Sequence, residues 1–155
     1  YVFNESLSGC ENGSKLTWND ETTAAFYGYE RGTTVYSGRP TSTTGYISLM
    51  YPSDYGYSVL ASSCARTTNL GSYNNSTCAG ESWLYGSGYE WTITPISSSR
   101  SNMWHVNYNG NLRSNNVSFG FVARSVLYLD SNVYVVDGSG TMTDPYIIGM
   151  NNDNL

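Results

Sequence analysis

The sequence predicts a β-rich α+β domain built from antiparallel hairpins and short helices. Strands are favoured over helices because 16 glycines interrupt the 155 residues, and because no window of about 12 residues shows sustained apolar periodicity at 3.6. The clearest local signal is the stretch from Met103 to Tyr108, where apolar and polar residues alternate. It is followed by Asn109-Gly110, the strongest short hairpin-turn signal.

The strands of this hairpin are expected to present one face to the core and the other to solvent. The residues expected to point inward are Trp104, Val106 and Tyr108. Those expected to point outward are His105, Asn107 and either Asn111 or Arg113. Because side chains alternate along a strand, the two sets fall on opposite faces.

Two short helices are expected, over residues 20–27 and 53–64. Ser53 or Asp54 would be the N-cap of the second helix, since both residue types favour that position. Further strands are expected over residues 119–129, 133–136 and 146–148. We expect one domain over residues 1–148 and a flexible tail over residues 149–155.

The composition distinguishes a folded chain from a disordered one. Leu, Ile, Val and Phe supply only 29 residues, a share low enough to raise the question of disorder. However, 15 Tyr and four Trp offer large surfaces for burial, and only 12% of the residues are charged. The aromatic residues are therefore expected to replace the missing aliphatic side chains in the core.

The charge balance excludes two classes of partner. The chain has seven Lys and Arg residues and twelve Asp and Glu residues, which gives a net charge of −5. Proteins that bind nucleic acids or anionic membranes need clusters of Lys and Arg instead. The longest apolar runs have four or five residues, for example around Val126 and Val135, far fewer than the roughly 20 that cross a bilayer. We expect no nucleic-acid binding and no membrane insertion by this segment.

The composition, rich in Ser, Thr and Asn, is typical of a secreted protein. The chain starts at Tyr1 without an initiating Met or a signal peptide, and we expect a processed or truncated ectodomain. An extracellular or cell-surface location follows.

Three cysteines bear on the redox chemistry. Cys64 and Cys78 bracket a polar loop, and a disulfide between them would stabilise the fold by roughly 3 kcal/mol. The alternative is a pair of reduced structural thiols. Cys10 has no obvious partner: it could pair with a removed segment or another subunit, or be free. Two cysteines and the single His105 are too few for a zinc site at this spacing, so we expect no metal.

Four motifs occur in a recognisable order along the chain. They are Trp83-Leu84-Tyr85, then Trp91-Thr92-Ile93-Thr94-Pro95, then Trp104-His105-Val106-Asn107, and finally the run from Arg124 to Val133. Together they resemble the C-type-lectin-like domain of bacterial surface proteins, in the group of the Fibrobacter major paralogous domain and the formylglycine-generating enzyme. A closer resemblance is to proteins of Gram-positive gut bacteria, many of which resemble type IV prepilins.

The resemblance covers roughly residues 45–148 and departs from the family pattern at one motif. The family usually has Gly-Val-Arg-Pro where this chain has Val122-Ala123-Arg124-Ser125. Proline would fix φ and remove a backbone donor, so the strand at this motif is expected to differ in geometry. The fold that the resemblance implies is the C-type-lectin-like fold.

The resemblance also implies a ligand-binding surface over residues 97–118. In such folds, including the variable proteins of diversity-generating retroelements, ligands are held on this surface by exchangeable side chains. The candidate ligand-binding residues are Ser98, Ser99, Arg100, Asn102, His105, Asn107, Asn109, Asn111, Arg113, Asn115 and Asn116. Their composition is similar to that of an antibody paratope. The alternative is a solvated polar hairpin without a ligand.

Catalysis finds little support in the sequence. His105 is the only histidine and has no carboxylate neighbour along the hairpin, so we expect no catalytic residues and no cofactor. A formylglycine-generating oxidase would need paired cysteines late in the domain, but the last cysteine is Cys78. Arg124 is expected on a buried strand where an acidic side chain or carbonyl groups accept from it. Trp83 and Trp91 are expected in the core.

The sequence therefore leaves three candidate functions. The first is a non-enzymatic adhesin- or receptor-type module on a bacterial surface or pilus, which binds a protein or glycan ligand on another cell or surface. The second is a structural pilin-type subunit, the head domain of a filament protein. The third and least supported is a relative of the formylglycine-generating enzymes.

Overall fold

The computed structural model describes residues 2–3, 22–30, 43–44, 47–96, 101–139 and 143–151. Within these residues the chain forms short helices and four small antiparallel sheets, which confirms the predicted β-rich α+β class. The helices are α1 (Thr23–Glu30), α2 (Pro52–Tyr57) and the 3-10 turns η2 (Leu70–Ser72) and η3 (Ala79–Glu81). No helix among the described residues is long and apolar enough to cross a bilayer.

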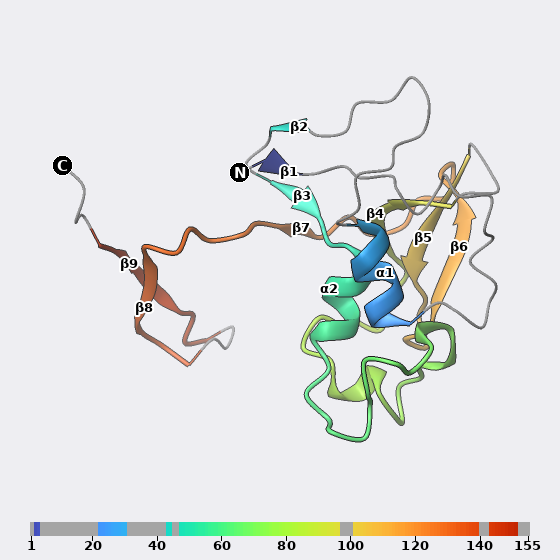
Figure 1. Ribbon diagram of the computed structural model, residues 1–155, viewed down its shortest axis with the longest axis horizontal. Helices are drawn as coiled ribbons and strands as arrows, with labels where there is room; N and C mark the ends of the chain where they lie inside the picture. The colour runs from blue at the N-terminus through green and yellow to red at the C-terminus, as the bar shows by residue number, and fades with distance from the viewer. Residues whose placement is uncertain are drawn as a thin grey trace.

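The sheets are pairs of strands except for one of three strands. The pairs are β1 (Val2–Phe3) with β2 (Thr43–Thr44), β3 (Ser48–Leu49) with β7 (Ser125–Val126), and β8 (Val133–Asp137) with β9 (Ile147–Met150). The three-stranded sheet has the order β4 (Glu90–Pro95), β5 (Asn102–Val106) and β6 (Leu112–Asn116). Figure 1 shows α1 and α2 side by side next to this sheet, with the β8–β9 hairpin standing clear of it.

Both predicted helices exist, but their bounds differ from the prediction. Helix α1 starts at Thr23 because the Thr22 hydroxyl caps it, accepting from the Ala25 N–H at 3.2 Å. Helix α2 starts at Pro52, the first-turn position that proline favours, so the N-cap is Tyr51 and not Ser53 or Asp54. Asp54 instead lies in the first turn and accepts from the Tyr51 N–H at 2.9 Å.

Helix α2 ends at Tyr57, well before the predicted residue 64. The chain leaves the helix because Val59 pairs with Ser82 and the Leu60 N–H donates to the Glu81 carbonyl at 3.2 Å. Buried Glu30, the last residue of α1, links the two helices. Its carboxylate accepts hydrogen bonds from the N–H and the hydroxyl of Ser53 in α2. A buried carboxylate requires such donors, because its oxygens have lost their contact with water.

The core lies between the helices and the inner face of the three-stranded sheet. Its largest members are aromatic, as the composition predicted, and Phe26 meets Trp104 edge to face with ring centroids 5.4 Å apart. The buried hydrophobic cluster consists of Phe26, Met50, Tyr55, Leu70, Tyr73, Cys78, Ala79, Leu84, Trp104, Val106 and Leu112. Burying each large side chain stabilises the fold by about 1.5–3 kcal/mol.

The predicted disulfide is present. Cys64 and Cys78 are bonded, with their Cα atoms 5.7 Å apart, and they close the loop below α2. Cys10 lies outside the described residues.

The predicted β5–β6 hairpin is confirmed, with Val106 opposite Leu112 and a five-residue turn between them. Trp104 and Val106 point into the core as predicted. Tyr108 does not: it lies past the end of β5, and its side chain is 56% exposed.

The prediction of a strand over residues 119–129 is wrong except at β7. After β6 the chain turns at Val117 and Phe119, and residues 119–122 return alongside β4, where Val122 pairs in parallel with Glu90. The Trp91 N–H donates to the Val122 carbonyl and the Val122 N–H donates to the Tyr89 carbonyl, both at 2.9 Å. We call residues 119–122 the covering segment, because the Phe121 ring lies against Trp91 and His105 on the outer face of the sheet.

Two core assignments are also corrected. Trp83 is 70% exposed, because it lies on the turn after η3 and projects beside α2. Trp91 is half-buried beneath Phe121, with ring centroids 4.6 Å apart.

The prediction that Arg124 lies on a buried strand is also wrong. Its side chain is about one-third exposed, and it precedes β7.

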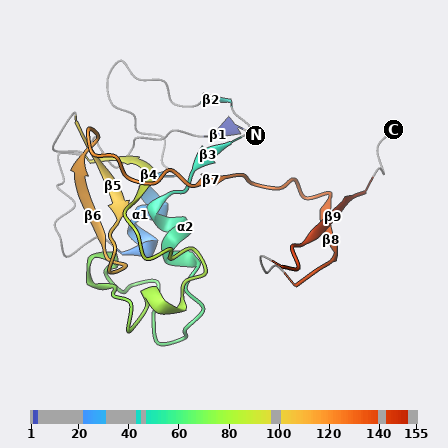
Figure 2. The same cartoon turned by 180° about the vertical axis from the view of Figure 1, so that it is seen from behind.

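The predicted strands at residues 133–136 and 146–148 are confirmed as the β8–β9 hairpin, with Val135 opposite Ile148. Of the predicted tail over residues 149–155, Gly149 and Met150 belong to β9 and pair with Tyr134 and Val133. Residues 152–155 lie outside the described part of the chain. Figure 2 shows from behind that the hairpin is joined to the body by an extended segment.

Candidate functional site

The sequence-predicted ligand-binding residues do not form one surface. Asn102 lies opposite Asn116 and next to Asn115 at one end of the β5–β6 hairpin, whereas Asn107 and Asn109 lie in the turn at the other end. Ser98, Ser99 and Arg100 lie outside the described residues. The candidate residues among those described therefore form two groups, one at each end of the hairpin.

Two of the predicted residues are buried and cannot face a ligand. His105 is 2% exposed and Asn111 is 7% exposed. In the amide orientation that satisfies its neighbours, Asn111 accepts from the Arg113 guanidinium at 3.0 Å and donates to Asn109 at 2.7 Å. Asn111 and Arg113 thus hold the turn from within the molecule.

His105 does point away from the core, as the alternation predicted, but the covering segment buries it there. Its ring lies against Phe121 at 4.8 Å, Trp91 at 5.7 Å and Tyr89 at 6.0 Å between centroids. Burial, and secondly the positive charge of Arg113, lower its pKa from 6.5 to about 4. The prediction that His105 faces solvent is therefore wrong, and the imidazole is neutral at pH 7.

Acidification is expected to destabilise the fold through His105. Because the folded-state pKa is below the unfolded value, stability is lost as the pH falls through the window from 6.5 towards 4. Between pH 7 and about pH 4.5 we expect this group to lower the free energy of unfolding by about 2 kcal/mol. Urea unfolding of wild type and His105→Phe at both pH values measures this loss, and the variant is expected to lose about 2 kcal/mol less than wild type. Equal losses in the two proteins would contradict the lowered pKa of His105.

The exposed part of this region is a pair of tyrosines at the turn end of the sheet. Tyr108 is 56% exposed and Tyr89 is 41% exposed, and their ring centroids lie 5.5 Å apart. Tyr89 also stacks on Phe121 at 4.8 Å with an interplanar angle of 21°. We call the two loops that carry these tyrosines, residues 86–89 and residues 107–109, the tyrosine surface.

The loop over residues 86–89 is supported by an ion pair. Nε of Arg124 lies 2.7 Å from Oε1 of Glu90, whose side chain is 5% exposed. Burial raises the pKa of Glu90, and the charge and hydrogen bond of Arg124 offset only part of this effect, so the pKa stays above its ordinary value. Gly86 passes so close that a Cβ there would approach the Arg124 guanidinium to 2.6 Å. The expected acidic acceptor of Arg124 is thus Glu90.

The turn that carries Tyr108 is fixed by hydrogen bonds from two tyrosine hydroxyl groups, one buried and one near the surface. The buried Tyr55 hydroxyl donates to the Gly110 carbonyl at 2.6 Å, and the Tyr85 hydroxyl donates to the Tyr108 carbonyl at 2.6 Å. Gly110 has a φ of +90°, which glycine adopts without strain. Burial raises the pKa of Tyr55, so the hydroxyl remains a donor throughout the physiological range.

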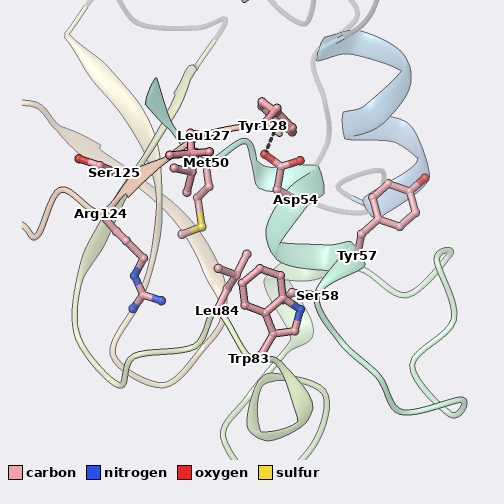
Figure 3. A pocket seen from close by; sticks show the side chains of 11 residues that line it. Met50, Asp54, Tyr57, Ser58, Trp83, Leu84, Arg124, Ser125, Leu127 and Tyr128 are labelled. Atoms are coloured by element: carbon pink, nitrogen blue, oxygen red, sulfur yellow. Dashed lines mark hydrogen bonds between the residues drawn. The ribbon is translucent and has the colours of Figure 1, made fainter. Parts of the chain in front are cut away.

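A pocket of about 540 Å³ lies on another part of the body, between α2 and residues 124–128. Figure 3 shows its lining: Met50, Leu84 and Leu127 form apolar walls, Trp83 lies at one side, and Arg124 lies opposite Tyr57. The Asp54 carboxylate accepts from the Tyr128 hydroxyl at 2.6 Å across the pocket wall. We call this cavity the α2 pocket.

Sequence reasoning missed both Tyr89 and the α2 pocket. The sequence signal for Tyr89 was the run Gly86-Ser87-Gly88 before it, which indicates a turn. In the structure Ser87 adopts a φ of +53° there, which is uncommon for a residue other than glycine. The pocket has no comparable sequence signal, since its walls come from three segments that lie far apart in the sequence, around Met50, Trp83 and Arg124.

No group of three or more His, Cys, Asp or Glu side chains among the described residues is placed to hold a metal ion. Comparison with protein-family models, with curated proteins and with solved structures returned no match for this chain.

Proposed function

We propose that this protein is a non-enzymatic, extracellular ligand-binding module with a C-type-lectin-like fold, displayed on a bacterial surface or pilus. The observation that carries the proposal is the tyrosine surface, on which Tyr89 and Tyr108 are exposed although the Tyr89 ring stacks on Phe121 and the Tyr108 carbonyl accepts from the Tyr85 hydroxyl. Its ligand is a protein or glycan on another cell or surface.

The chemistry of the tyrosine surface supports recognition. It combines two exposed aromatic rings with Ser87, Asn107 and Asn109, the side-chain types that dominate antibody binding loops. Tyrosine supplies large contact area at little entropic cost, and the amides supply adaptable hydrogen bonds. Because the turn is already fixed, little conformational entropy would be lost on binding.

The other expected contacts remain part of the proposal. Asn102, Asn115 and Asn116 are half-buried at the far end of the hairpin and would contact only a ligand long enough to cross the sheet. Location outside the cell is supported by the disulfide between Cys64 and Cys78, since such bonds persist in oxidising compartments.

Loss of the Tyr108 ring is expected to weaken ligand binding at least tenfold, because a central exposed aromatic contributes about 1.4 kcal/mol or more to such an interface. The probes are a printed glycan array and immobilised mucin, fibronectin and collagen. Wild type and Tyr108→Ala are compared on each.

Tyr134→Ala is the matched control, because Tyr134 is 48% exposed but lies on the β8–β9 hairpin. Binding that is lost in Tyr108→Ala and retained in Tyr134→Ala supports the tyrosine surface. Binding that is unchanged in Tyr108→Ala, or absent from every probe for wild type, contradicts the proposal.

A further inference from the structure

His105 lies directly beneath the tyrosine surface. The centroid of its ring is 6.0 Å from that of Tyr89 and 4.8 Å from that of Phe121 in the covering segment. Tyr89 stacks on Phe121, and its ring centroid lies 5.5 Å from that of Tyr108. Tyr89 therefore has two roles, because it shields the imidazole from water and forms half of the exposed aromatic pair.

The described surroundings of His105 hold no charge that could balance an imidazolium. Arg113 lies opposite on β6 and is itself a cation, and Tyr89 is a phenol. The Glu90 carboxylate is held by Arg124 and points to the inner face of the sheet. Neither β5 nor the covering segment has another titratable side chain. Within the described part of the chain, Nδ1 of His105 has no hydrogen-bond partner. A proton on this ring therefore creates a charge that is neither hydrated nor paired.

The covering segment is held by few contacts. Its Phe119 and Val122 side chains are 52% and 59% exposed, and a Cβ at Gly120 would meet nothing within 4 Å. Two backbone hydrogen bonds of 2.9 Å attach it, one from the Trp91 N–H to the Val122 carbonyl and one from the Val122 N–H to the Tyr89 carbonyl. A segment that buries so little surface can open while the core stays folded.

We propose that protonation of His105 opens the tyrosine surface, because the covering segment and the Tyr89 ring move away and admit water to the imidazolium. His105 is thus a positioning residue of this surface, which is assembled while the imidazole is neutral. In the closed state, burial and the Arg113 charge lower the pKa of His105 to about 4, whereas the hydrated ring of the open state recovers its ordinary value of 6.5. Acid therefore favours the open state.

Release of ligand in acid follows from this opening. A ligand that contacts Tyr89 and Tyr108 binds the closed state, so ligand binding and protonation of His105 oppose each other by the same factor in both directions. This consequence rests on the proposed function, whereas the opening itself needs no ligand. The two are therefore tested by separate measurements.

Amide hydrogen exchange of the isotope-labelled full chain, without ligand, tests the opening. The reporters are the N–H groups of Trp91 and Val122, which are bonded while the covering segment is closed. Between pH 7 and about pH 4.5 their protection factors are expected to fall on the order of 50-fold, the effect of a pKa that changes from about 4 to 6.5 on opening. Low concentrations of urea should alter their exchange little, because the opening exposes little surface.

Two controls accompany these reporters. The N–H groups of Phe26 and Tyr55 are bonded within the core helices, so they exchange on global unfolding and should respond steeply to urea. His105→Phe keeps an aromatic ring that cannot be protonated, and its Trp91 and Val122 protection is expected to be equal at the two pH values. The wild-type imidazole signals, which are unambiguous because the chain has one histidine, should titrate with a midpoint well below 6.5.

Four results overturn the proposal. An imidazole midpoint near 6.5 means that the ring is already hydrated. Reporter protection that is independent of pH in wild type means that the neighbouring rings stabilise the imidazolium through cation–π contacts. Reporters that follow Phe26 and Tyr55 at every urea concentration indicate global unfolding alone. An equal loss of protection in His105→Phe assigns the effect to another group.

The consequence for binding is measured on the printed glycans, mucin, fibronectin and collagen at pH 7 and about pH 4.5. Wild type is expected to lose affinity in acid, and His105→Phe is expected to keep it. Equal affinity of wild type at both pH values overturns the coupling between protonation and ligand binding. Failure of every probe at pH 7 contradicts the proposed function alone, since hydrogen exchange decides whether the surface opens.

Discussion

Gly110→Ala is expected to lower the free energy of unfolding by about 4 kcal/mol, combining about 1–2 kcal/mol for a left-handed backbone with overpacking. Gly110 has a φ of +90°, and a Cβ at this position would overlap the Ala79 methyl group and lie 3.3 Å from the Tyr55 hydroxyl oxygen. The substitution therefore disturbs the hydrogen bond that anchors the turn of Tyr108. Chemical denaturation, monitored by tryptophan fluorescence, measures the loss.

Gly120→Ala is the matched control for this substitution. A Cβ at Gly120 meets nothing within 4 Å, and its φ lies outside the left-handed region. We expect its stability to stay within about 0.5 kcal/mol of wild type, as for most surface substitutions. Equal effects of the two substitutions would show that the turn is not held against Ala79 and Tyr55.

Arg124→Ala is expected to cost about 2 kcal/mol at pH 7, because it leaves the buried Glu90 carboxylate without its compensating charge. This value is below that of a fully buried pair because Arg124 is itself 37% exposed. The pKa of Glu90 is already raised by burial, and removing the guanidinium raises it further. The difference in stability between wild type and the variant should therefore grow as the pH rises from about 5 to 7, because the folded variant resists ionisation of Glu90.

The double variant Arg124→Ala with Glu90→Gln separates charge from packing. With no carboxylate to bury, it should regain most of the lost stability, and its only remaining dependence on pH in this window should be the one that His105 gives to every variant. Urea unfolding of wild type, Arg124→Ala, Glu90→Gln and the double variant at about pH 5 and pH 7 forms the required double-mutant cycle. A double variant no more stable than Arg124→Ala would mean that the arginine acts through packing of its side chain beneath Gly86.

The features that sequence predicted well are those set by short-range physics. Asn109-Gly110 specified a turn because its backbone requires a positive φ, and the β5–β6 hairpin follows from it. The spacing of Cys64 and Cys78 and the polar loop between them indicated the disulfide. The strand of residues 133–136 was recognised from its apolar β-branched run.

The errors arose where distant segments decide the environment. Alternation correctly assigned His105 to the face opposite Trp104, but a period of two cannot show that Phe121 returns to cover that face. The same fold-back explains why residues 119–129 are not one strand. Trp83 was assigned to the core by residue type alone, although its place on the turn after η3 leaves it exposed.

The candidate site was predicted in part for the same reason. The sequence indicated the 97–118 region, and Asn107 and Asn109 do lie beside the exposed Tyr108. The partner Tyr89 comes from a loop about 20 residues earlier and is brought there by the pairing of β4 with β5. A contact between segments of this kind requires the sheet register, which the sequence alone did not provide.

The most direct test of the tyrosine surface is amide NMR of the isotope-labelled full chain, titrated with whichever glycan or matrix protein binds it on the arrays. The account predicts that the largest shift changes occur at residues 86–89 and 107–109, with smaller changes at Phe119 and Phe121 beneath the tyrosine rings. Changes confined to Asn102, Asn115 and Asn116, or to the α2 pocket around Trp83, would contradict it.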